Sequence, residues 1–403
     1  MSGQSPLSMM RPAGSRLGNR RAGRRWPRPL LILAPIAIII ALGLAWTWLW
    51  YYAAAFADAE LSGWVEREAT AGRIYGCTAQ TISGFPLRIA AHCSDPVAEI
   101  RNSQPQFAVR AQDLTFSAEV YHPTLLTGEV TGPLTLAESD KPPVLRANWS
   151  RARVRVHGRP PDPDDVAFIL EGPRLERAGA GAGGGNGAVL FAAKHADLQG
   201  RIVSGSARDN PVIETVLHLA AATAPTLHPL AAEPIELELD ATLRGFKDLA
   251  PKTWAEHFRE MQAAGGGIDV KFLRVARSDA VVVGQGTLGI NAHGKLDGLI
   301  SVAVVGIEHI VPLLGVDKMI GRGIDRLAGS DSASQGLNAL DKLVPGLGGA
   351  LRDSANGGLI DNLKKMGQPT EIDKKPAIVL PLRFSDGLIY LGIVPVGEVP
   401  PLF

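Results

Sequence analysis

The sequence predicts a mainly β protein in which an N-terminal transmembrane helix is followed by a curved, mostly antiparallel β-sheet domain with a few amphipathic helices. The helix is indicated by an uncharged, largely apolar run at residues 29–57. The sheet is indicated by repeated alternation of apolar and polar residues, as in the segment PIELELDATL at residues 234–243. The 45 glycines and 29 prolines among 403 residues favour many short elements that end in turns.

The membrane anchor is expected at residues 30–52, which span about 34 Å as a helix and are long enough to cross a bilayer. Residues 1–29 carry seven arginines and no acidic residue, and the far end of the apolar run holds three tryptophans and two tyrosines. Aromatic side chains favour the membrane interface, and positively charged flanks stay in the cytoplasm. Residues 1–29 are therefore expected to be a basic cytoplasmic tail, with the remaining chain on the other side.

A cleaved signal peptide is the alternative interpretation of this run. Ala55, Phe56 and Ala57 form a small-x-small cleavage site. The apolar run is longer than the core of an ordinary signal peptide and ends in bulky aromatic residues, which favours retention as an anchor. Both interpretations place the following domain outside the cytoplasm.

Composition divides the rest of the chain into five parts. A first β-rich part with a disulfide hairpin is expected at 53–177, followed by a Gly/Ala-rich loop at 178–187. A second β-rich part is expected at 188–308, a Gly-rich helical segment at 309–372 and a closing β-hairpin at 373–403. Charge is nearly balanced outside the arginine-rich tail, so no nucleic-acid partner is indicated.

The two cysteines of the chain, Cys77 and Cys93, are expected to form one structural disulfide. Each lies eight residues from Phe85, so a hairpin centred on Phe85 would set the two cysteines directly opposite each other. Pairing of two such cysteines is the simplest expectation in an oxidising compartment. A redox role is disfavoured because the C-x-x-C spacing is absent.

Three further patterns mark the first β-rich part. A short polar helix at 58–73 continues from the membrane and carries one apolar stripe. Residues 107–120 alternate in the manner of strands, with a slip near Asp113 that indicates a bulge or a tight bend. The segment RARVRVH then places three arginines on one strand face, which could contact an anionic headgroup or partner or simply face solvent: Arg151, Arg153 and Arg155.

A helix and a hairpin are expected in the second β-rich part. The helix covers 251–264 and ends at three consecutive glycines. The hairpin turns at residues 293–295 through a three-residue loop, because matching the apolar faces groups Leu288 and Ile290 with Gly298 and Ile300. A two-residue turn is the alternative and would mix the two faces.

The closing hairpin is expected to turn at Asp386 and Gly387, a pair typical of type I′ turns. That turn pairs apolar residues on one face, namely Phe384 with Ile389, Leu382 with Leu391 and Leu380 with Ile393. Before it, residues 309–367 have apolar residues at helical spacing interrupted by glycines, which predicts short, loosely held amphipathic helices. These helices either cap the end of a sheet, or form a lid over an apolar groove or touch a membrane.

No motif of a known catalytic class is present. The chain lacks H-E-x-x-H, G-x-S-x-G and closely spaced metal-binding carboxylates. A G-x-G-x-x-G match at Gly284, Gly286 and Gly289 continues into a strand rather than a helix, so it does not indicate dinucleotide binding. We therefore predict no catalytic residue, no metal and no cofactor, and a protein that is not an enzyme; an unrecognised hydrolase is a distant third reading.

Several of these features together resemble the domain-of-unknown-function family 2125 of Gram-negative inner-membrane proteins. The resemblance rests on the N-terminal anchor, the helix with Trp64, the Gly-x-Leu repeats near 286–298 and two motifs, Cys77…Gly84-Phe85-Pro86…Cys93 and Leu380-Pro381-Leu382-x-Phe384-x-Asp386-Gly387. The chain is more distantly similar to AsmA-like envelope proteins, which implies a curved β-sheet with an apolar groove that carries phospholipid. The resemblance implies a single-pass protein of the bacterial inner membrane, with its C-terminal domain in the periplasm.

Two functions are expected from these observations. The first is a non-enzymatic envelope protein that binds or handles lipid, since one-sided strands would give the periplasmic sheet an apolar face. The second is a membrane-anchored scaffold that binds a partner protein through its sheet edges or its arginine stripe. The expected partners are thus the membrane, through residues 30–52, and phospholipid or another envelope protein.

Overall fold

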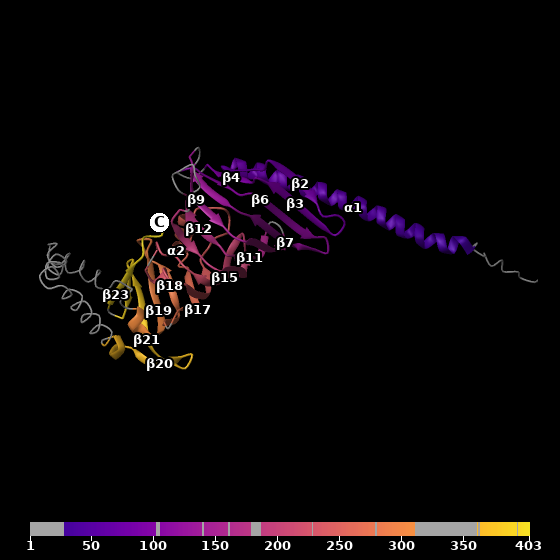
Figure 1. Ribbon diagram of the computed structural model, residues 1–403. Coiled ribbons are helices and arrows are strands. Elements are labelled where there is room, and N and C mark those ends of the chain that lie inside the picture. Colours follow the sequence, from indigo (N-terminus) through magenta and orange to yellow (C-terminus); the bar gives the residue numbers. More distant parts are fainter. Residues whose placement is uncertain are drawn as a thin grey trace, which may run out of the picture. The chain divides into compact units, whose positions relative to one another are not determined.

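The computed structural model describes residues 28–101, 105–138, 141–159, 162–178, 187–227, 229–278, 280–310, 361, 363–392 and 394–403 (Figure 1). The chain divides into two compact units, residues 1–53 and residues 54–403. Helix α1 (Arg28–Thr70) runs from the first into the second. By its length and composition, this helix could cross a membrane, and it is the one such helix among the described residues. The anchor and the expected short helix after it are therefore a single helix.

The second unit contains two antiparallel sheets, and the strands of each sheet follow one another in chain order. The short sheet has seven strands: β1 (Arg73–Gly76), β4 (Val97–Ile100), β5 (Phe107–Arg110), β8 (Leu134–Glu138), β9 (Pro143–Asn148), β12 (Arg174–Arg177) and β13 (Val189–Ala192).

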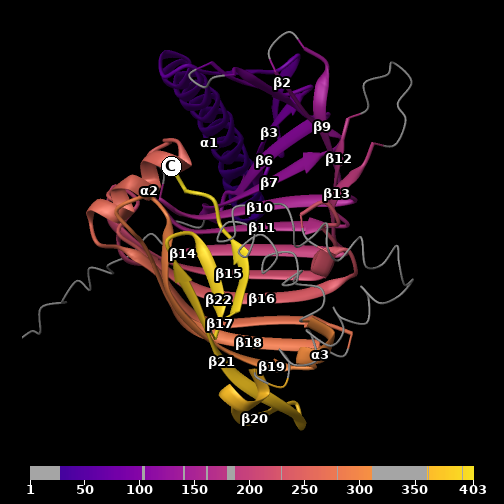
Figure 2. The same ribbon diagram turned by 90° about the vertical axis from the view of Figure 1, so that its left-hand side faces the viewer.

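The long sheet has sixteen strands (Figure 2): β2 (Ala79–Ser83), β3 (Arg88–Ser94), β6 (Asp113–Glu119), β7 (His122–Thr131), β10 (Arg151–Arg159), β11 (Asp162–Glu171), β14 (His195–Ser206), β15 (Asp209–Ala222), β16 (Ile235–Arg244), β17 (Gly267–Arg277), β18 (Ala280–Ile290), β19 (Leu296–Val305), β20 (Gln368–Ile372), β21 (Lys375–Ser385), β22 (Leu388–Leu391) and β23 (Val394–Glu398). The mostly antiparallel β fold expected from the alternating segments is thus confirmed.

The chain passes repeatedly from one sheet to the other. At each crossing, a bend of two residues separates a strand of the short sheet from a strand of the long sheet, and the two strands would otherwise form one long strand. The bends lie at residues 77–78, 95–96, 111–112, 132–133, 149–150, 172–173 and 193–194. Backbone hydrogen bonds continue through several of them, for example from the Asp95 amide to the Gln112 carbonyl. Strand pairs therefore alternate between the sheets, and the slip expected near Asp113 is one of these bends.

The long sheet has one apolar face, which we call the inner face. Residues directly opposite each other on neighbouring strands share a face, so the register defines a row that crosses from β2 to β21. Every member of this row is apolar: Ile82, Ala91, Phe116, Gly128, Val154, Phe168, Leu198, Leu217, Leu239, Leu273, Gly284, Val302 and Leu380. The adjacent row on the outer face is mostly polar or charged, from His92 and Thr115 to Glu238 and Arg274.

The C-terminal end of the inner face is a filled hydrophobic core. Leu380 is completely buried, and Val302 and Ile300 are nearly so. Leu363, from a helical turn before β20, and Ile307, from α3 (Ile307–Ile310), pack in the same cluster. This part of the inner face is therefore closed by the chain itself.

Helix α2 (Trp254–Ala263) lies between β16 and β17. It begins directly after its N-cap residue, Thr253, and not at Pro251 as expected. The Thr253 side chain accepts a hydrogen bond from the Glu256 amide, and the Glu256 carboxylate accepts one from the Thr253 amide. This reciprocal pair satisfies two amides that have no partner within the helix. The other short helix, η1 (Pro229–Ala231), precedes β16.

The turn of the closing hairpin has the expected register. Phe384 pairs with Ile389 and Leu382 with Leu391 across Asp386 and Gly387, both of which have positive φ. The third expected pair involves Ile393, which lies outside the described residues. Residues 179–186 of the expected Gly/Ala-rich loop and residues 311–360 of the expected helical segment lie outside them too.

Two expectations of the second half need correction. In the β18–β19 hairpin, Leu288 pairs with Gly298 and Ile290 with Leu296, so the three-residue loop lies one position earlier than expected. The Asn291 side chain accepts hydrogen bonds from the amides of His293 and Lys295, and this turn chemistry moves the loop. Gln368–Ile372, placed in the helical segment, instead form β20, because residues 373 and 374 adopt positive φ and fold the chain back as a hairpin.

Replacing Glu214 by glutamine should weaken the outer face in a pH-dependent way. Hydrogen bonds from Lys271 and Arg201 lower the pKa of Glu214 below its ordinary value. A lowered folded-state pKa stabilises the fold above the unfolded pKa, and this contribution disappears as the pH falls through the folded value. Urea unfolding of the full chain in detergent should therefore show Glu214→Gln less stable than the wild type at pH 7 but not at strongly acidic pH.

The control for this prediction is Glu371→Gln, which removes an exposed carboxylate from β20 elsewhere in the long sheet. It should change stability little at either pH, because isolated surface charges contribute little. A difference between Glu214→Gln and the wild type that persists unchanged in acid would contradict the prediction.

Candidate functional site

The candidate site is a partly open, mainly apolar cavity of about 560 Å³ near the N-terminal ends of the two sheets. Three elements supply its walls. The apolar and aromatic part of its lining includes Leu61, Trp64 and Val65 of α1, Tyr75, Ala98, Val109 and Leu134 of the short sheet, and Ala91, Leu114, Phe116 and Val130 of the long sheet. Polar lining residues are Ser62, Glu66, Gln80 and His92. The cavity volume falls within the roughly 300–1,000 Å³ of ligand pockets, although its lining is more uniformly apolar than most.

The bends between the sheets are what form this cavity. Because each strand of the short sheet is continuous with a strand of the long sheet, the inner faces of both sheets meet at the line of bends. One cross-strand row of the short sheet faces the same way, namely Tyr75, Ala98, Val109 and Leu136. The two faces together make the interior of the cavity mainly apolar.

The last turns of α1 close one side of the cavity. Trp64 stacks on Tyr75, with ring centroids 4.8 Å apart. The Gln80 side-chain amide donates to the Asp58 carboxylate at 2.7 Å. The helix segment that follows Ala54 is therefore held along β1 and β2, and Leu61, Trp64 and Val65 are its apolar contribution to the cavity wall.

An ion pair between Arg73 and Glu68 lies beside Tyr75 at this wall. The Arg73 guanidinium donates to the Glu68 carboxylate, and this bond raises the pKa of Arg73. Burial raises the pKa of the Tyr75 hydroxyl, and the neighbouring Glu68 charge raises it further. Tyr75 therefore stays neutral at physiological pH and brings an uncharged hydroxyl to a mainly apolar lining.

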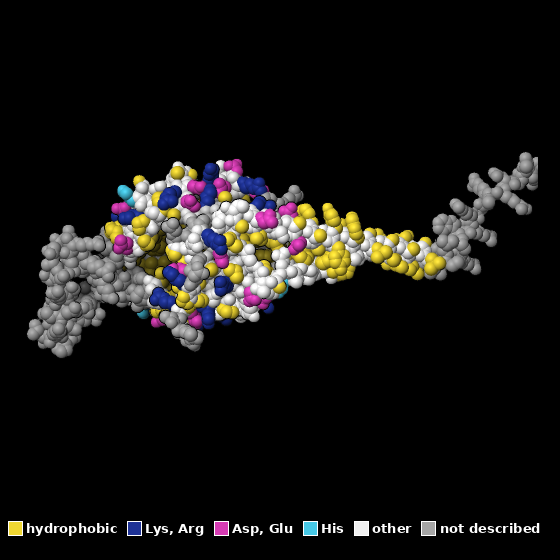
Figure 3. Space-filling model, turned by 90° about the horizontal axis from the view of Figure 1, so that it is seen from above, with side chains coloured by type: hydrophobic (Ala, Val, Ile, Leu, Met, Phe, Trp, Pro, Cys, Tyr) yellow, Lys and Arg dark blue, Asp and Glu magenta, His cyan; other side chains and the backbone are white. Residues whose placement is uncertain are grey.

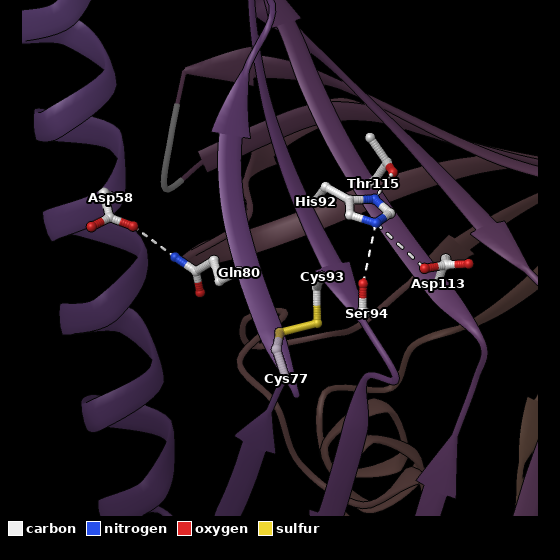
Figure 4. Close-up of a disulfide and its surroundings, with 8 residues drawn as sticks. All are labelled: Asp58, Cys77, Gln80, His92, Cys93, Ser94, Asp113 and Thr115. Atoms are coloured by element: carbon white, nitrogen blue, oxygen red, sulfur yellow. Dashed lines mark hydrogen bonds and ion pairs between the residues drawn. A yellow bond between two sulfur atoms is a disulfide. The ribbon is translucent and has the colours of Figure 1, made fainter.

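The disulfide between Cys77 and Cys93 forms part of the same wall (Figure 4). Their Cα atoms are 5.5 Å apart, but the expected register is wrong, because Cys93 lies opposite Gln80 and the hairpin turns one to two residues later than Phe85. Cys77 lies in the connection between β1 and β2. The bond therefore ties the passage from the short to the long sheet onto β3.

The inner face remains open beyond the cavity. We call the four half-exposed side chains Phe116, Leu126, Phe168 and Leu198 the open strip; each is between 36% and 45% exposed. Phe116 lines the cavity, and the register connects it through Gly128 and Val154 to Phe168 and Leu198. The strip thus extends the apolar surface of the cavity across four strand steps, about 19 Å at roughly 4.8 Å per step.

Gly128 keeps this surface smooth. A Cβ at this position would lie 2.7 Å from the Phe116 ring, closer than any real contact. The absence of a side chain therefore lets the ring lie over the strand. In the space-filling view, charged side chains lie on the outside of the β unit, and apolar side chains are visible in the hollows between them (Figure 3).

One cluster at the cavity combines a histidine with two hydroxyls and a carboxylate. His92 Nδ1 lies 2.9 Å from Thr115 Oγ1, whereas Ser94 Oγ and Asp113 Oδ1 lie 3.3 Å and 3.4 Å from the same Nε2 (Figure 4). In a Ser-His-Asp triad the serine and the carboxylate lie on opposite ring nitrogens. Ser94 and Asp113 share one nitrogen, so these two do not form that arrangement, and the contact of His92 with Thr115 links β3 to β6.

The arginine stripe lies on the outer face of β10, away from the cavity. Arg153 donates to Glu129 at 2.8 Å, and Arg151 lies opposite Glu171 in the register. Arg155 lies between Thr127 and Ala167 on the neighbouring strands. The structure therefore does not bring the three arginines together with the apolar site, and contact with an anion stays a prediction.

Two other sequence features have plain structural roles. The G-x-G-x-x-G match lies within strand β18, as expected for a chance match. A Cβ at Gly286 would lie 2.1 Å from the Leu299 carbonyl, so this glycine permits close approach of β19. Among the described residues, no group of three or more His, Cys, Asp or Glu side chains is placed to hold a metal ion.

Most residues of the cavity and the open strip carry no motif, and the sequence prediction did not select them. Phe116, Val109 and Ala98 are ordinary alternating strand residues in the sequence. A partial signal exists in the Pro, Gly or Trp at four of the bends, those at residues 95–96, 132–133, 149–150 and 172–173. It would have located these bends but not the strands that meet across the cavity.

Fold and site together define a class: a β-sheet protein with one candidate membrane helix and an internal apolar cavity that opens onto an apolar strip. The chain matches, over residues 50–400, the family described as uncharacterized protein conserved in bacteria (DUF2125), and it belongs to that family. Comparisons with curated proteins and with solved structures found no match. The distant similarity to AsmA-like envelope proteins stays a prediction.

Proposed function

We propose that this protein is a non-enzymatic component of the bacterial inner membrane whose periplasmic domain binds lipid acyl chains. The cavity between the sheets, with its continuous apolar lining, is the observation that carries the proposal. The polar side chains of its lining are few: Ser62, Glu66, Tyr75, Gln80 and His92. Of these, Gln80 and His92 are hydrogen-bonded within the protein, to Asp58 and Thr115. Each methylene transferred from water into such a site contributes about 0.8 kcal/mol.

The open strip supports a chain-like ligand. It continues the cavity surface along the inner face to Phe168 and Leu198, so the apolar surface is elongated rather than spherical. Exposed contiguous apolar surface of this kind is uncommon in a protein that binds nothing. A lipid with one acyl chain in the cavity and further apolar surface on the strip fits this shape.

The proposed compartment rests on the N-terminal region and the disulfide. Seven arginines precede the apolar run, which favours a cytoplasmic N-terminus. A disulfide forms and persists in an oxidising compartment such as the periplasm. Cavity residue Leu61 follows the expected anchor, which ends at Tyr52, by only nine positions in the chain. The domain is thus tethered close to a source of phospholipid.

The test is whether cavity volume controls bound lipid. The full chain is purified in detergent, and its phospholipid is extracted and quantified by mass spectrometry. The double variant Ala91→Phe with Ala98→Phe places two rings in the cavity and should reduce bound phospholipid several-fold. The control Ala263→Phe makes the same substitution at an exposed position of α2 and should leave the lipid content unchanged.

The outcomes separate cavity lipid from lipid around the anchor. If the double variant retains as much phospholipid as the wild type, all of the lipid surrounds the anchor and the proposal fails. Should the variant not fold, the wild type is loaded with a phospholipid that carries a photoreactive acyl chain. Crosslinks are then expected on peptides that contain Trp64 or Phe116. Crosslinks to one partner protein, with none on these peptides, would instead favour the alternative function as a scaffold that binds a partner protein.

A further inference from the structure

Two neighbouring hairpin tips of the long sheet expose large apolar side chains. We call Phe85, Leu87 and Tyr121 the tip surface; they are 50%, 55% and 61% exposed. The first two belong to the turn between β2 and β3, and Tyr121 belongs to the turn between β6 and β7. The Val120 amide donates to the Leu87 carbonyl at 2.9 Å, so the two tips lie side by side (Figure 1).

Such side chains are unusual at turns. Turn residues are mostly Gly, Asn, Asp, Ser and Pro, because these residues suit tight backbone geometry and remain hydrated. Here half or more of each of these large side chains remains exposed. A cluster of exposed aromatic and aliphatic side chains at a protein's extremity marks a binding surface.

The direction of β2 indicates where this surface points. Tyr75 stacks on Trp64, and Gln80 bonds to Asp58, so the chain after α1 runs back along the helix toward Ala54. The strand from Gln80 to the end of β2 covers a distance of about 10 Å at roughly 3.3 Å per residue. The helix from Asp58 back to Ala54 covers a distance of about 6 Å at roughly 1.5 Å per residue. The tips therefore project beyond the point at which the chain leaves this unit for the apolar run.

We propose that the tip surface inserts into the interfacial region of the phospholipid bilayer that holds the anchor. The chain leaves this unit for the apolar run at Ala54, on the side of the unit toward which the tips project. Phenylalanine, tyrosine and leucine are the side chains that partition into this region. Arg88 and Glu119 lie opposite each other behind the tips, and their charges cancel. The proposed attraction of the tip surface to the bilayer is therefore apolar rather than electrostatic.

This second attachment does not depend on the proposed lipid cavity. A single helix leaves a domain free to turn about its tether, whereas a second contact fixes its orientation. The cavity and the tip surface share β2, β3 and β6, so a docked tip also sets the orientation of the cavity relative to the bilayer.

The test measures the depth of labelled side chains in the full chain, reconstituted into vesicles of phosphatidylethanolamine and phosphatidylglycerol. Among the described residues no cysteine is free, and the chain has no others, so a single introduced thiol takes a nitroxide label. Leu87→Cys and Tyr121→Cys report on the tips. Leu299→Cys is the matched control, because Leu299 is 50% exposed on the outer face of β19. Collision rates with oxygen and with a polar nickel complex are compared.

The ratio of oxygen to nickel collisions should be several-fold higher at positions 87 and 121 than at 299, because oxygen concentrates in lipid and the nickel complex in water. Equal ratios at the three positions would overturn the proposal, and so would exclusion of both reagents from the tips, which indicates a protein contact. Should Tyr121→Cys unfold the hairpin, Phe85→Cys takes its place in the same comparison. Lipid extraction from these variants should remain at the wild-type level, which separates this result from the cavity test.

Discussion

Leu380→Ala should lower the free energy of unfolding by about 2–5 kcal/mol, the range found when a buried leucine is truncated and leaves a cavity. Leu380 has no exposed surface and lies in the one cluster that closes the C-terminal end of the inner face. Its neighbours come from several strands and from the turn that carries Leu363, so they cannot collapse together into the space. Urea unfolding of the full chain in detergent, followed by tryptophan fluorescence, measures the loss.

The matched control is Leu299→Ala, the same change on the opposite face of the sheet. Leu299 is half exposed, and its truncation should cost about 0.5 kcal/mol or less. Similar losses in the two variants would show that the C-terminal core does not dominate the stability of the sheet.

Replacing both cysteines by serine should cost about 3 kcal/mol, as expected for closing a loop of this length. Cys77 and Cys93 are separated by 16 positions, and their bond joins the passage between the sheets to β3. Both must be replaced, because a single substitution leaves a reactive thiol in the cavity wall. The same urea titration applies, with the wild type under oxidising and reducing conditions as a second comparison.

The reduced wild type should match Cys77→Ser with Cys93→Ser, and adding reductant to the double variant should change nothing. If the double variant were as stable as the oxidised wild type, the helix contacts through Trp64 and Gln80 would suffice to hold β1 and β2. In that case the disulfide would not contribute to the stability of the cavity wall.

Local patterns predicted much of the fold. The alternation in PIELELDATL matches β16, and Asp386 with Gly387 fixes the register of the closing hairpin. These features depend on neighbours in sequence, so they can be read without the fold. The hairpin at Asn291 shows the limit, because one side chain that bonds to two amides moved the loop by a residue.

The candidate site depends on relations that the sequence does not display. An apolar inner face was expected from one-sided strands, but a row from Ile82 to Leu380 exists only once each register is known. The predicted disulfide between Cys77 and Cys93 is present, but the predicted register of the hairpin is wrong. Cys77 can reach Cys93 from the connection before β2 as well as from a strand, so the spacing of the two cysteines did not fix the register. The cavity arises from bends that bring two stretches of one strand onto different sheets, and periodicity shows only the interruption.

The order of strands has a consequence for how the domain assembles. In both sheets the strands pair in chain order, except that β19 pairs with β21 past β20, and the described part of the chain contains no return from the C-terminal to the N-terminal edge. Most partners therefore lie close in sequence, which is the arrangement associated with faster folding for a β protein. A chain that emerges N-terminus first can add strand pairs to a growing edge, so the cavity wall is complete before the C-terminal core is synthesised.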